Sequence, residues 1–137
     1  MNRPLNKLAV INTRNNDPLN IIVIGLGHQS LDDHIPAIKD SSEFELVGVV
    51  DVNRELAASV GAQEGVPYDV SVEGILSALG SNHDCALVAI PHSSYLPIIR
   101  LLANRKIHIL KEKPFAVSLE DAQTIKGLVE KMILHCK

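Results

Sequence analysis

The sequence predicts an α/β protein with one domain, built on a doubly wound parallel sheet that helices cover on both faces. Segments typical of strands alternate with segments typical of helices, the order that gives parallel sheets with right-handed crossovers. The four consecutive β-branched residues at 21–24 are typical of a strand buried on both faces. Hydrophobic residues make up 46% of the 137 residues and aromatic residues only 3%, so we expect an aliphatic core.

Strand and helix patterns follow one another from residue 20 to near the end of the chain. Residues 1–19 are polar and are expected to form a loose leader, with at most a short strand at 7–11, and residues 20–137 form the domain. The expected strands are 20–24, 45–51, 66–68, 85–90 and 107–110, and the expected helices are 30–39, 54–64, the segment between Ser71 and Gly80, 95–103 and the segment after Ser118.

Capping residues mark where several of these helices begin and end. Ser71 and Ser118 precede helical patterns and have acidic residues shortly after them, which is typical of helix starts. Gly65 and Gly80 follow helical patterns, where glycine favours the left-handed conformation that ends a helix. The last helix is amphipathic, and its apolar face is expected to hold Ile125, Leu128, Val129 and Met132.

The stretch that suggests chemistry follows the first strand. Gly25 allows a tight turn, and Gly27 lets phosphate groups approach bare backbone at the positive end of the next helix. The third position of the G-x-G-x-x-G/A pattern holds Ser30, which is small enough for close helix–strand packing and can also cap the helix. The alternative is that both glycines merely end an element of a helical protein.

An acidic residue lies at the end of the second expected strand. Asp51 comes 21 residues after Ser30, where a carboxylate accepts hydrogen bonds from adenosine ribose hydroxyls and repels the extra phosphate of NADP. The alternative is that Asp51 caps the following helix. Arg54 could instead accept a phosphate, although it is more typical of a solvated helix charge.

Two further strand ends are expected near the same edge, because ligands of open α/β sheets lie beyond the carboxyl ends of the strands. Pro91 ends the fourth strand, and His92 and Tyr95 could line a nicotinamide pocket, although His92 alone is more typical of a polar loop. The charged run 111–114 follows the fifth strand. Such a run is usually a solvated turn, but Lys113 could bind a carboxamide or hydroxyl oxygen or transfer a proton.

Composition argues against several other classes of protein. The formal charge of −3, with interleaved acids and bases, does not favour a nucleic-acid surface. No apolar run has the length of a membrane span, and the N-terminus lacks the apolar core of a signal peptide. Two cysteines are too few for a disulfide framework, so a reducing cytoplasm is the default. The six histidines show no paired ligand spacing, and we expect no metal.

Five motifs in chain order resemble the N-terminal domain of the Gfo/Idh/MocA oxidoreductases, over roughly residues 20–134. They are Gly-Leu-Gly-His-Gln-Ser at 25–30, His-Ile-Pro-Ala at 34–37, Val-Val-Asp at 49–51, Val-Ala-Ile-Pro at 88–91 and Glu-Lys-Pro at 112–114. The resemblance implies a Rossmann-like domain that binds NAD, with NADP a weaker expectation, in an enzyme that moves a hydride to or from a hydroxyl-bearing carbon of a sugar or cyclitol. It implies Lys113 as the catalytic residue. The implied cofactor-binding residues are Gly25, Leu26, Gly27, His28, Gln29, Ser30, Asp51, Val52, Ile90, Pro91, His92, Tyr95, Glu112, Lys113 and Pro114.

The sequence departs from that family in four ways. Ser30 replaces Gly or Ala, His92 stands where Asn is frequent, and Tyr95 stands where His is frequent. The chain ends at Lys137, before the family's substrate domain, so we expect a shortened form of a longer protein or a free-standing module. A sugar or polyol is expected as a partner only with that domain, and the chain alone is expected to be inactive. Homo-oligomer formation stays open.

The alternatives to an oxidoreductase domain are a non-enzymatic dinucleotide-binding or interaction module and, more weakly, a domain for another nucleotide such as a methyl donor.

Overall fold

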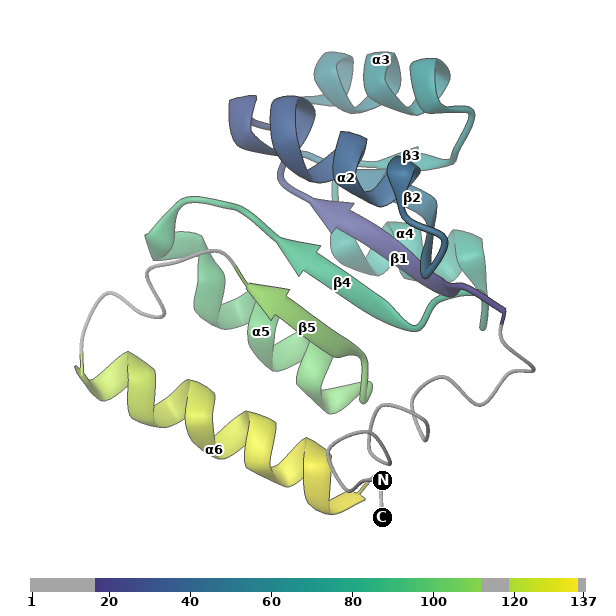
Figure 1. Cartoon of the computed structure of the whole chain (residues 1–137). Helices are drawn as coiled ribbons and strands as arrows, with labels where there is room; N and C mark the ends of the chain where they lie inside the picture. The colour runs from purple at the N-terminus through teal and green to yellow at the C-terminus, as the bar shows by residue number, and fades with distance from the viewer. Residues whose placement is uncertain (1–16, 112–118, 136–137) are drawn as a thin grey trace.

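A five-stranded parallel sheet organises the computed structural model, which describes residues 17–111 and 119–135 (Figure 1). The strand order is β3-β2-β1-β4-β5, which places β1 at the centre and confirms the predicted doubly wound sheet. The strands are β1 (Leu19–Ile24), β2 (Phe44–Val50), β3 (Tyr68–Asp69), β4 (Cys85–Val88) and β5 (His108–Lys111). The helical elements are the π-helical turn η1 (Ser30–His34), α2 (Ile35–Asp40), α3 (Arg54–Glu64), α4 (Val72–Leu79), the 3₁₀ turn η2 (His92–Ser94), α5 (Tyr95–Asn104) and α6 (Leu119–His135).

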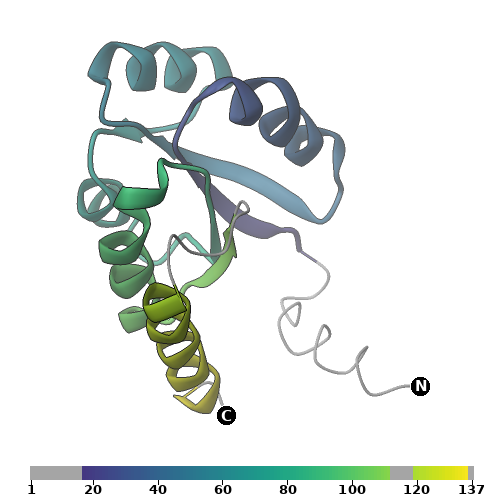
Figure 2. The ribbon, with the colours of Figure 1, turned by 90° about the vertical axis from the view of Figure 1, so that its left-hand side faces the viewer.

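Helices cover the two faces of the sheet and bury two separate aliphatic clusters. The strand β1 contributes to both, because Ile21 and Val23 pack toward α2 and α3 while Ile22 and Ile24 pack toward α4, α5 and α6. The buried four-residue run therefore has the two-sided environment that its composition predicts. Figures 1 and 2 show these layers, with α2 and α3 on one side of the sheet and α5 and α6 on the other.

The ends of the central helices match the predicted capping residues. Ser71 caps α4 by accepting a hydrogen bond from the Gly74 N–H at 3.0 Å. Gly65 ends α3 in the left-handed conformation with φ +69°, whereas Gly80 follows α4 with φ +62° but with ψ −119°, outside that conformation. Ser118 lies outside the described residues, as does the expected strand at 7–11.

Two strands differ from their predicted ranges for identifiable reasons. The fourth strand was expected to reach Ile90, but β4 ends at Val88, because its ladder partner Ile24 is the last residue of β1. The third strand was expected at 66–68, but β3 begins at Tyr68, because the Val66 N–H closes the end of α3 on the Gly61 carbonyl at 3.0 Å. The other three strands have shifted ends too: β1 begins one residue earlier than expected, β2 begins and ends one residue earlier, and β5 begins and ends one residue later.

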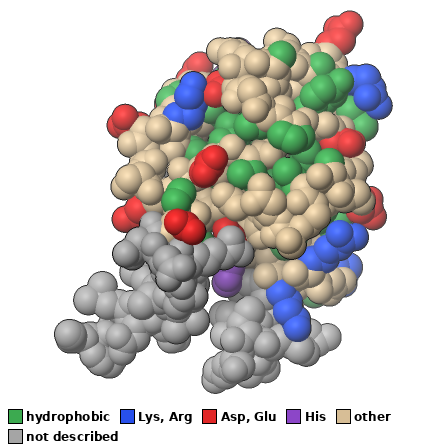
Figure 3. Space-filling model, turned by 90° about the vertical axis from the view of Figure 1, so that its right-hand side faces the viewer, with side chains coloured by type: hydrophobic (Ala, Val, Ile, Leu, Met, Phe, Trp, Pro, Cys, Tyr) green, Lys and Arg blue, Asp and Glu red, His purple; other side chains and the backbone are tan. Residues whose placement is uncertain are grey.

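The amino ends of the strands form a face of mixed character. Hydrophobic side chains gather near its middle, and acidic and basic side chains are scattered around them (Figure 3). The described residues of this face therefore carry charges of both signs. None of the helices in the described ranges combines the length and the apolar character needed to cross a membrane.

Candidate functional site

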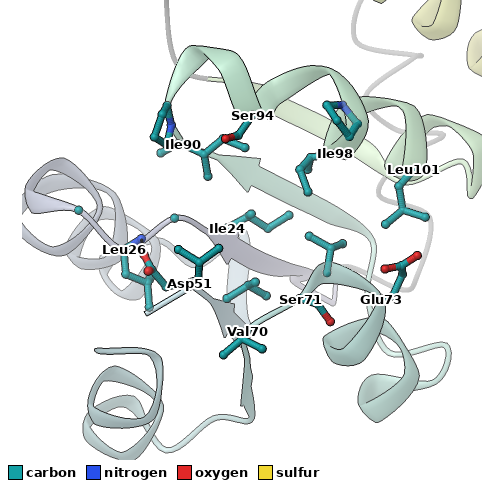
Figure 4. A pocket seen from close by; sticks show the side chains of 18 of the residues that line it. Ile24, Leu26, Asp51, Val70, Ser71, Glu73, Ile90, Ser94, Ile98 and Leu101 are labelled. Carbon is teal, nitrogen blue, oxygen red and sulfur yellow. Dashed lines mark hydrogen bonds between the residues drawn. The ribbon is translucent and has the colours of Figure 1, made fainter. Parts of the chain in front are cut away.

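A cavity of about 750 Å³ opens at the carboxyl ends of β1, β2 and β4, on the edge that faces the viewer in Figure 2. Its volume lies within the usual range for small-molecule sites. Leu26 and Asp51 lie at one end, and Ile98 and Leu101 of α5 face Val70 across it (Figure 4). Ligands of open α/β sheets occupy this position, outside the strand ends where the winding direction changes.

The turn after β1 is fixed by contacts that only glycine permits at residue 25. Gly25 has φ +98°, and a Cβ atom there would lie 2.1 Å from the Ala89 carbonyl oxygen. The Gly25 N–H donates to the Val50 carbonyl at 2.8 Å, which ties the turn to β2. The turn therefore packs directly against β2 and β4, and the alternative that Gly25 merely ends an element of a helical protein is wrong.

Gly27 has a different environment, because it borders open space. Apart from its own atoms and its two chain neighbours, no heavy atom lies within 4 Å of where its Cβ would be, and the residue lines the cavity. The first helical hydrogen bond runs from the Leu31 N–H to the Gly27 carbonyl at 3.1 Å. The N–H groups at 27–30 precede that bond and belong to the positively polarised start of the helix. The structure thus fits an anionic group approaching backbone at Gly27.

Ser30 does not cap this helix, which corrects one expectation. The helix begins before it, and the residue preceding η1 has no side-chain cap hydrogen bond. The Ser30 side chain is buried, and its hydroxyl donates to the Gly25 carbonyl at 2.6 Å. The reason is direction: the side chain points back toward the strand rather than forward toward free N–H groups. The other expectation, a small residue where helix and strand pack closely, agrees with its burial.

Asp51 lies just past β2 and faces the glycine turn. Its Oδ2 accepts a hydrogen bond from the Leu26 N–H at 2.8 Å, and its Oδ1 accepts one from the Asn53 N–H at 2.8 Å. Asn53 is the residue that caps α3, through its side-chain oxygen and the Leu56 N–H. The alternative that Asp51 is the helix cap is therefore wrong. A carboxylate has about four acceptor positions, so Asp51 can still receive hydroxyl donors from the cavity.

Apart from Ser30 and Tyr95, the predicted site residues fall into three groups. Those that line the cavity are Gly25, Leu26, Gly27, Asp51, Val52, Ile90 and Pro91. His28 and Gln29 lie exposed in the first helical turn, beside the cavity but not among its lining residues, and His92 lies in η2. Glu112, Lys113 and Pro114 lie outside the described residues, directly after β5.

Tyr95 does not line the cavity, which corrects its expected place in the nicotinamide pocket. The side chain is 4% exposed and belongs to the core beneath α5, together with Ile99 and Leu102. Helical spacing explains this, because residues 95, 99 and 102 share the inward face of α5. The Lys111 ammonium lies 3.7 Å from the Tyr95 ring centroid, and partial burial lowers the pKa of Lys111 below its ordinary value.

Sequence reasoning missed the far wall of the cavity. The start of α4 supplies Ser71 and Glu73, and α5 supplies Pro97, Ile98 and Leu101. The helix-start pattern at Ser71 located the element, but nothing local indicated that it faces the glycine turn. Apolar side chains dominate this wall, which suits a flat aromatic base more than a charged group. Within the described part of the chain, no three His, Cys, Asp or Glu side chains are grouped so as to hold a metal ion.

The parallel sheet, the glycine turn and the cavity at the strand ends define a nucleotide-binding domain of the Rossmann type. Comparison with known families identifies it further. The chain belongs to the Gfo/Idh/MocA oxidoreductase family, because the family model described as an oxidoreductase family with an NAD-binding Rossmann fold matches residues 19–136. The family assignment supports binding of a nicotinamide dinucleotide.

Relatives of known name are similar over most of this chain. UDP-N-acetylglucosamine 3-dehydrogenase of Acidithiobacillus ferrooxidans is 30% identical over 108 residues, which are 79% of this chain and 32% of the relative. D-xylose 1-dehydrogenase [NADP(+)] of Haloarcula marismortui is 27% identical over 81% of this chain and 31% of the relative. The WlbA dehydrogenase of Bordetella pertussis, solved with NADH and UDP-GlcNAcA, superposes with a TM-score of 0.77 at 25% identity, over 84% of this chain and 35% of that one. The chain thus spans about a third of the length of these relatives.

Proposed function

We propose that this chain is the cofactor domain of an oxidoreductase that prefers NAD to NADP and acts on a hydroxyl-bearing carbon of a sugar or cyclitol. The observation that carries the cofactor part is the position of Asp51. Its carboxylate lines the cavity and lies 2.8 Å from the N–H of Leu26 in the glycine turn. In dinucleotide-binding folds the adenosine ribose lies against a carboxylate beside the glycine turn, and Asp51 has this position.

Charge favours NAD over NADP at that position. The negative Asp51 would repel a phosphate on the ribose, and its free acceptor positions would receive the ribose hydroxyls. Arg54, three residues later, is exposed at the first turn of α3 and is the residue that could reverse this preference. One relative, the xylose dehydrogenase, is named as an NADP(+) enzyme, so the test compares the affinities for both cofactors.

The chain's own residues bind and orient the dinucleotide. The helix-start N–H groups beside Gly27 would hold the pyrophosphate, Asp51 the adenosine ribose, and the apolar wall of α4 and α5 would exclude water from the base. When bound, the nicotinamide ring supplies a site that accepts or gives a hydride. Lys113, which follows β5, would hold a substrate oxygen or move its proton at the Nζ atom. The sugar class rests on the relatives, which are named as dehydrogenases of sugars or of their nucleotide derivatives.

Calorimetric titration of the chain with NADH and NADPH tests the cofactor proposal. We expect NADH to bind more tightly, and Asp51→Ser to weaken NADH binding roughly tenfold or more, the loss of about 1.5–3 kcal/mol from a charge-assisted hydrogen bond. Asp40→Ser is the matched control, because Asp40 is an exposed acid at the end of α2 away from the cavity. A wild-type preference for NADPH would mean that Arg54, not Asp51, governs the site.

Hydride transfer is tested by NADH absorbance across a panel of sugars and polyols. Lys113→Ala should leave the dissociation constant for NADH within about threefold, a change of under 1 kcal/mol. Any turnover by wild type should disappear in this variant, because the lysine would hold the substrate oxygen or transfer its proton. Equal turnover by wild type and Lys113→Ala would show that Lys113 has no role in the reaction. Binding without turnover is the expected result for this chain alone, whereas turnover that disappears in Lys113→Ala would show that this domain is a complete enzyme.

A further inference from the structure

We infer that Ser30 is a positioning residue, whose hydroxyl locks the peptide group between Gly25 and Leu26 so that the glycine turn is preformed for a pyrophosphate. This inference rests on the proposed function and deepens it. Ser30 is the one polar side chain that is fully buried in the part of the chain that the structure describes, with 1% exposure. A buried hydroxyl at this place requires a partner, and its partner is the carbonyl oxygen of Gly25, 2.6 Å away.

Two hydrogen bonds hold this peptide group, one at its oxygen and one at its hydrogen. The Gly25 carbonyl oxygen accepts from the Ser30 hydroxyl, and the N–H of the same peptide group, on Leu26, donates to Asp51 Oδ2 at 2.8 Å. Because a peptide group is planar, holding the oxygen at one end and the hydrogen at the other fixes its orientation. Ser30 therefore works together with a residue of the proposed ribose site, across the turn from it.

Glycine makes such a lock necessary. Gly25 has φ +98°, and glycine populates many backbone conformations, so a flip of the 25–26 peptide group would be less hindered here than elsewhere. Its N–H is already held by the Val50 carbonyl, so the freedom that remains lies on the carbonyl side. A flipped peptide would separate the Leu26 N–H from Asp51 and move an acceptor oxygen away from its buried donor. The hydroxyl opposes this motion.

The glycine-rich sequence pattern does not require the hydrogen bond that the Ser30 hydroxyl makes. In G-x-G-x-x-G/A the third position provides space, and Ala provides that space as well as Ser does. Ser30 adds a donor, and it also begins η1, where the Ile35 N–H bonds to the Ser30 carbonyl across a widened turn. The variant Ser30→Ala therefore keeps the pattern intact and removes only the hydroxyl.

The test compares three ligands on the full chain by calorimetry: NADH, ADP and adenosine. NADH and ADP carry a pyrophosphate group and adenosine does not, so a misplaced glycine turn should weaken the first two more than adenosine, which meets the turn only through Asp51. Ser30→Ala should weaken NADH and ADP about three- to tenfold, the range that one net hydrogen bond supports, and weaken adenosine less. Ser59→Ala is the matched control, because Ser59 is exposed on α3.

Each outcome decides the question. A lower melting temperature with unchanged affinities would mean that the hydroxyl only stabilises the fold, and it would overturn the inference. An equal loss for adenosine would indicate distortion of the whole cavity and would overturn it too. If Ser30→Ala does not fold, Ser30→Cys keeps a similar volume with a weak donor and should show the same selective loss. If the wild-type chain binds neither NADH nor ADP, the proposed function and this inference are both overturned. If wild type and Ser30→Ala bind NADH and ADP with the same high affinity, this inference alone is overturned.

Discussion

Replacing Gly27 by Val should abolish dinucleotide binding and leave the fold intact. Gly27 lines the cavity, its Cβ position meets no heavy atom within 4 Å apart from its own and its two chain neighbours' atoms, and its φ lies outside the left-handed region. A valine side chain can therefore be accommodated by the protein, and it would project into the space that a pyrophosphate needs. We expect the free energy of unfolding to change by no more than about 0.5 kcal/mol, as for other exposed substitutions.

The loss of affinity follows from the contacts that the side chain would exclude. A phosphate kept away from the helix start loses at least two charge-assisted hydrogen bonds to backbone N–H groups, each worth about 1.5–3 kcal/mol. A loss of about 3 kcal/mol or more corresponds to roughly two orders of magnitude in the dissociation constant. The matched contrast is Gly25→Ala, whose Cβ would lie 2.1 Å from the Ala89 carbonyl oxygen at φ +98°. That variant should lose stability instead, by roughly 2–5 kcal/mol from backbone strain and overpacking.

Calorimetric titration with NADH and thermal melting followed by circular dichroism measure the two effects separately. Gly27→Val should have the same melting temperature as wild type but should not bind NADH. Gly25→Ala should have a melting temperature roughly 10 °C or more below that of wild type. Unchanged NADH affinity in a folded Gly27→Val protein would place the dinucleotide elsewhere. A Gly25→Ala protein as stable as wild type would show that the turn relaxes freely, and the account of a turn fixed against β4 would fail.

Two further predictions concern stability and thiol chemistry. Asn53→Ala removes the cap of α3 and should lower the free energy of unfolding by about 1 kcal/mol, measured by urea denaturation, and an unchanged midpoint would show that the cap contributes nothing. Burial, and then the negative charge of Asp84, raise the pKa of Cys85 to about 12. In a Cys136→Ser background, Cys85 should therefore react with a thiol reagent at pH 8 only at the rate of unfolding, and immediate reaction would contradict its burial. The thiol of the unfolded chain ionises at about pH 8.5. The unfolded chain therefore loses this proton at a lower pH than the folded one, and the free energy of unfolding should fall as the pH rises from there toward 12.

The sequence by itself determined the order of elements and the main turn. Apolar runs, capping residues and glycines act over a few neighbouring residues, so the patterns at Ile21–Ile24, Ser71 and Gly65 predicted elements that the structure contains. The rule that ligands of open α/β sheets lie beyond the carboxyl ends of the strands then predicted Asp51 and Pro91 at the edge where Gly25 lies, and the structure places them there. Capping signals were less decisive at Asp51, because Asp51 and Asn53 are both common cap residues and only the hydrogen bonds assign the cap to Asn53.

Only the tertiary structure decided which side chains face the cavity. Tyr95 lies in the core because α5 turns residues 95, 99 and 102 toward the sheet, a rotation that is set by packing against β5 and α6 rather than by local sequence. The same packing turns Ile98 and Leu101 toward the start of α4, so two helices that are separate in the sequence form one wall. Ser30 met the spacing rule from the sequence, yet its hydrogen bond to Gly25 depends on how the helix returns over the strand. Spacing along a chain fixes what an element is, whereas the direction of each side chain depends on neighbours that folding brings from elsewhere.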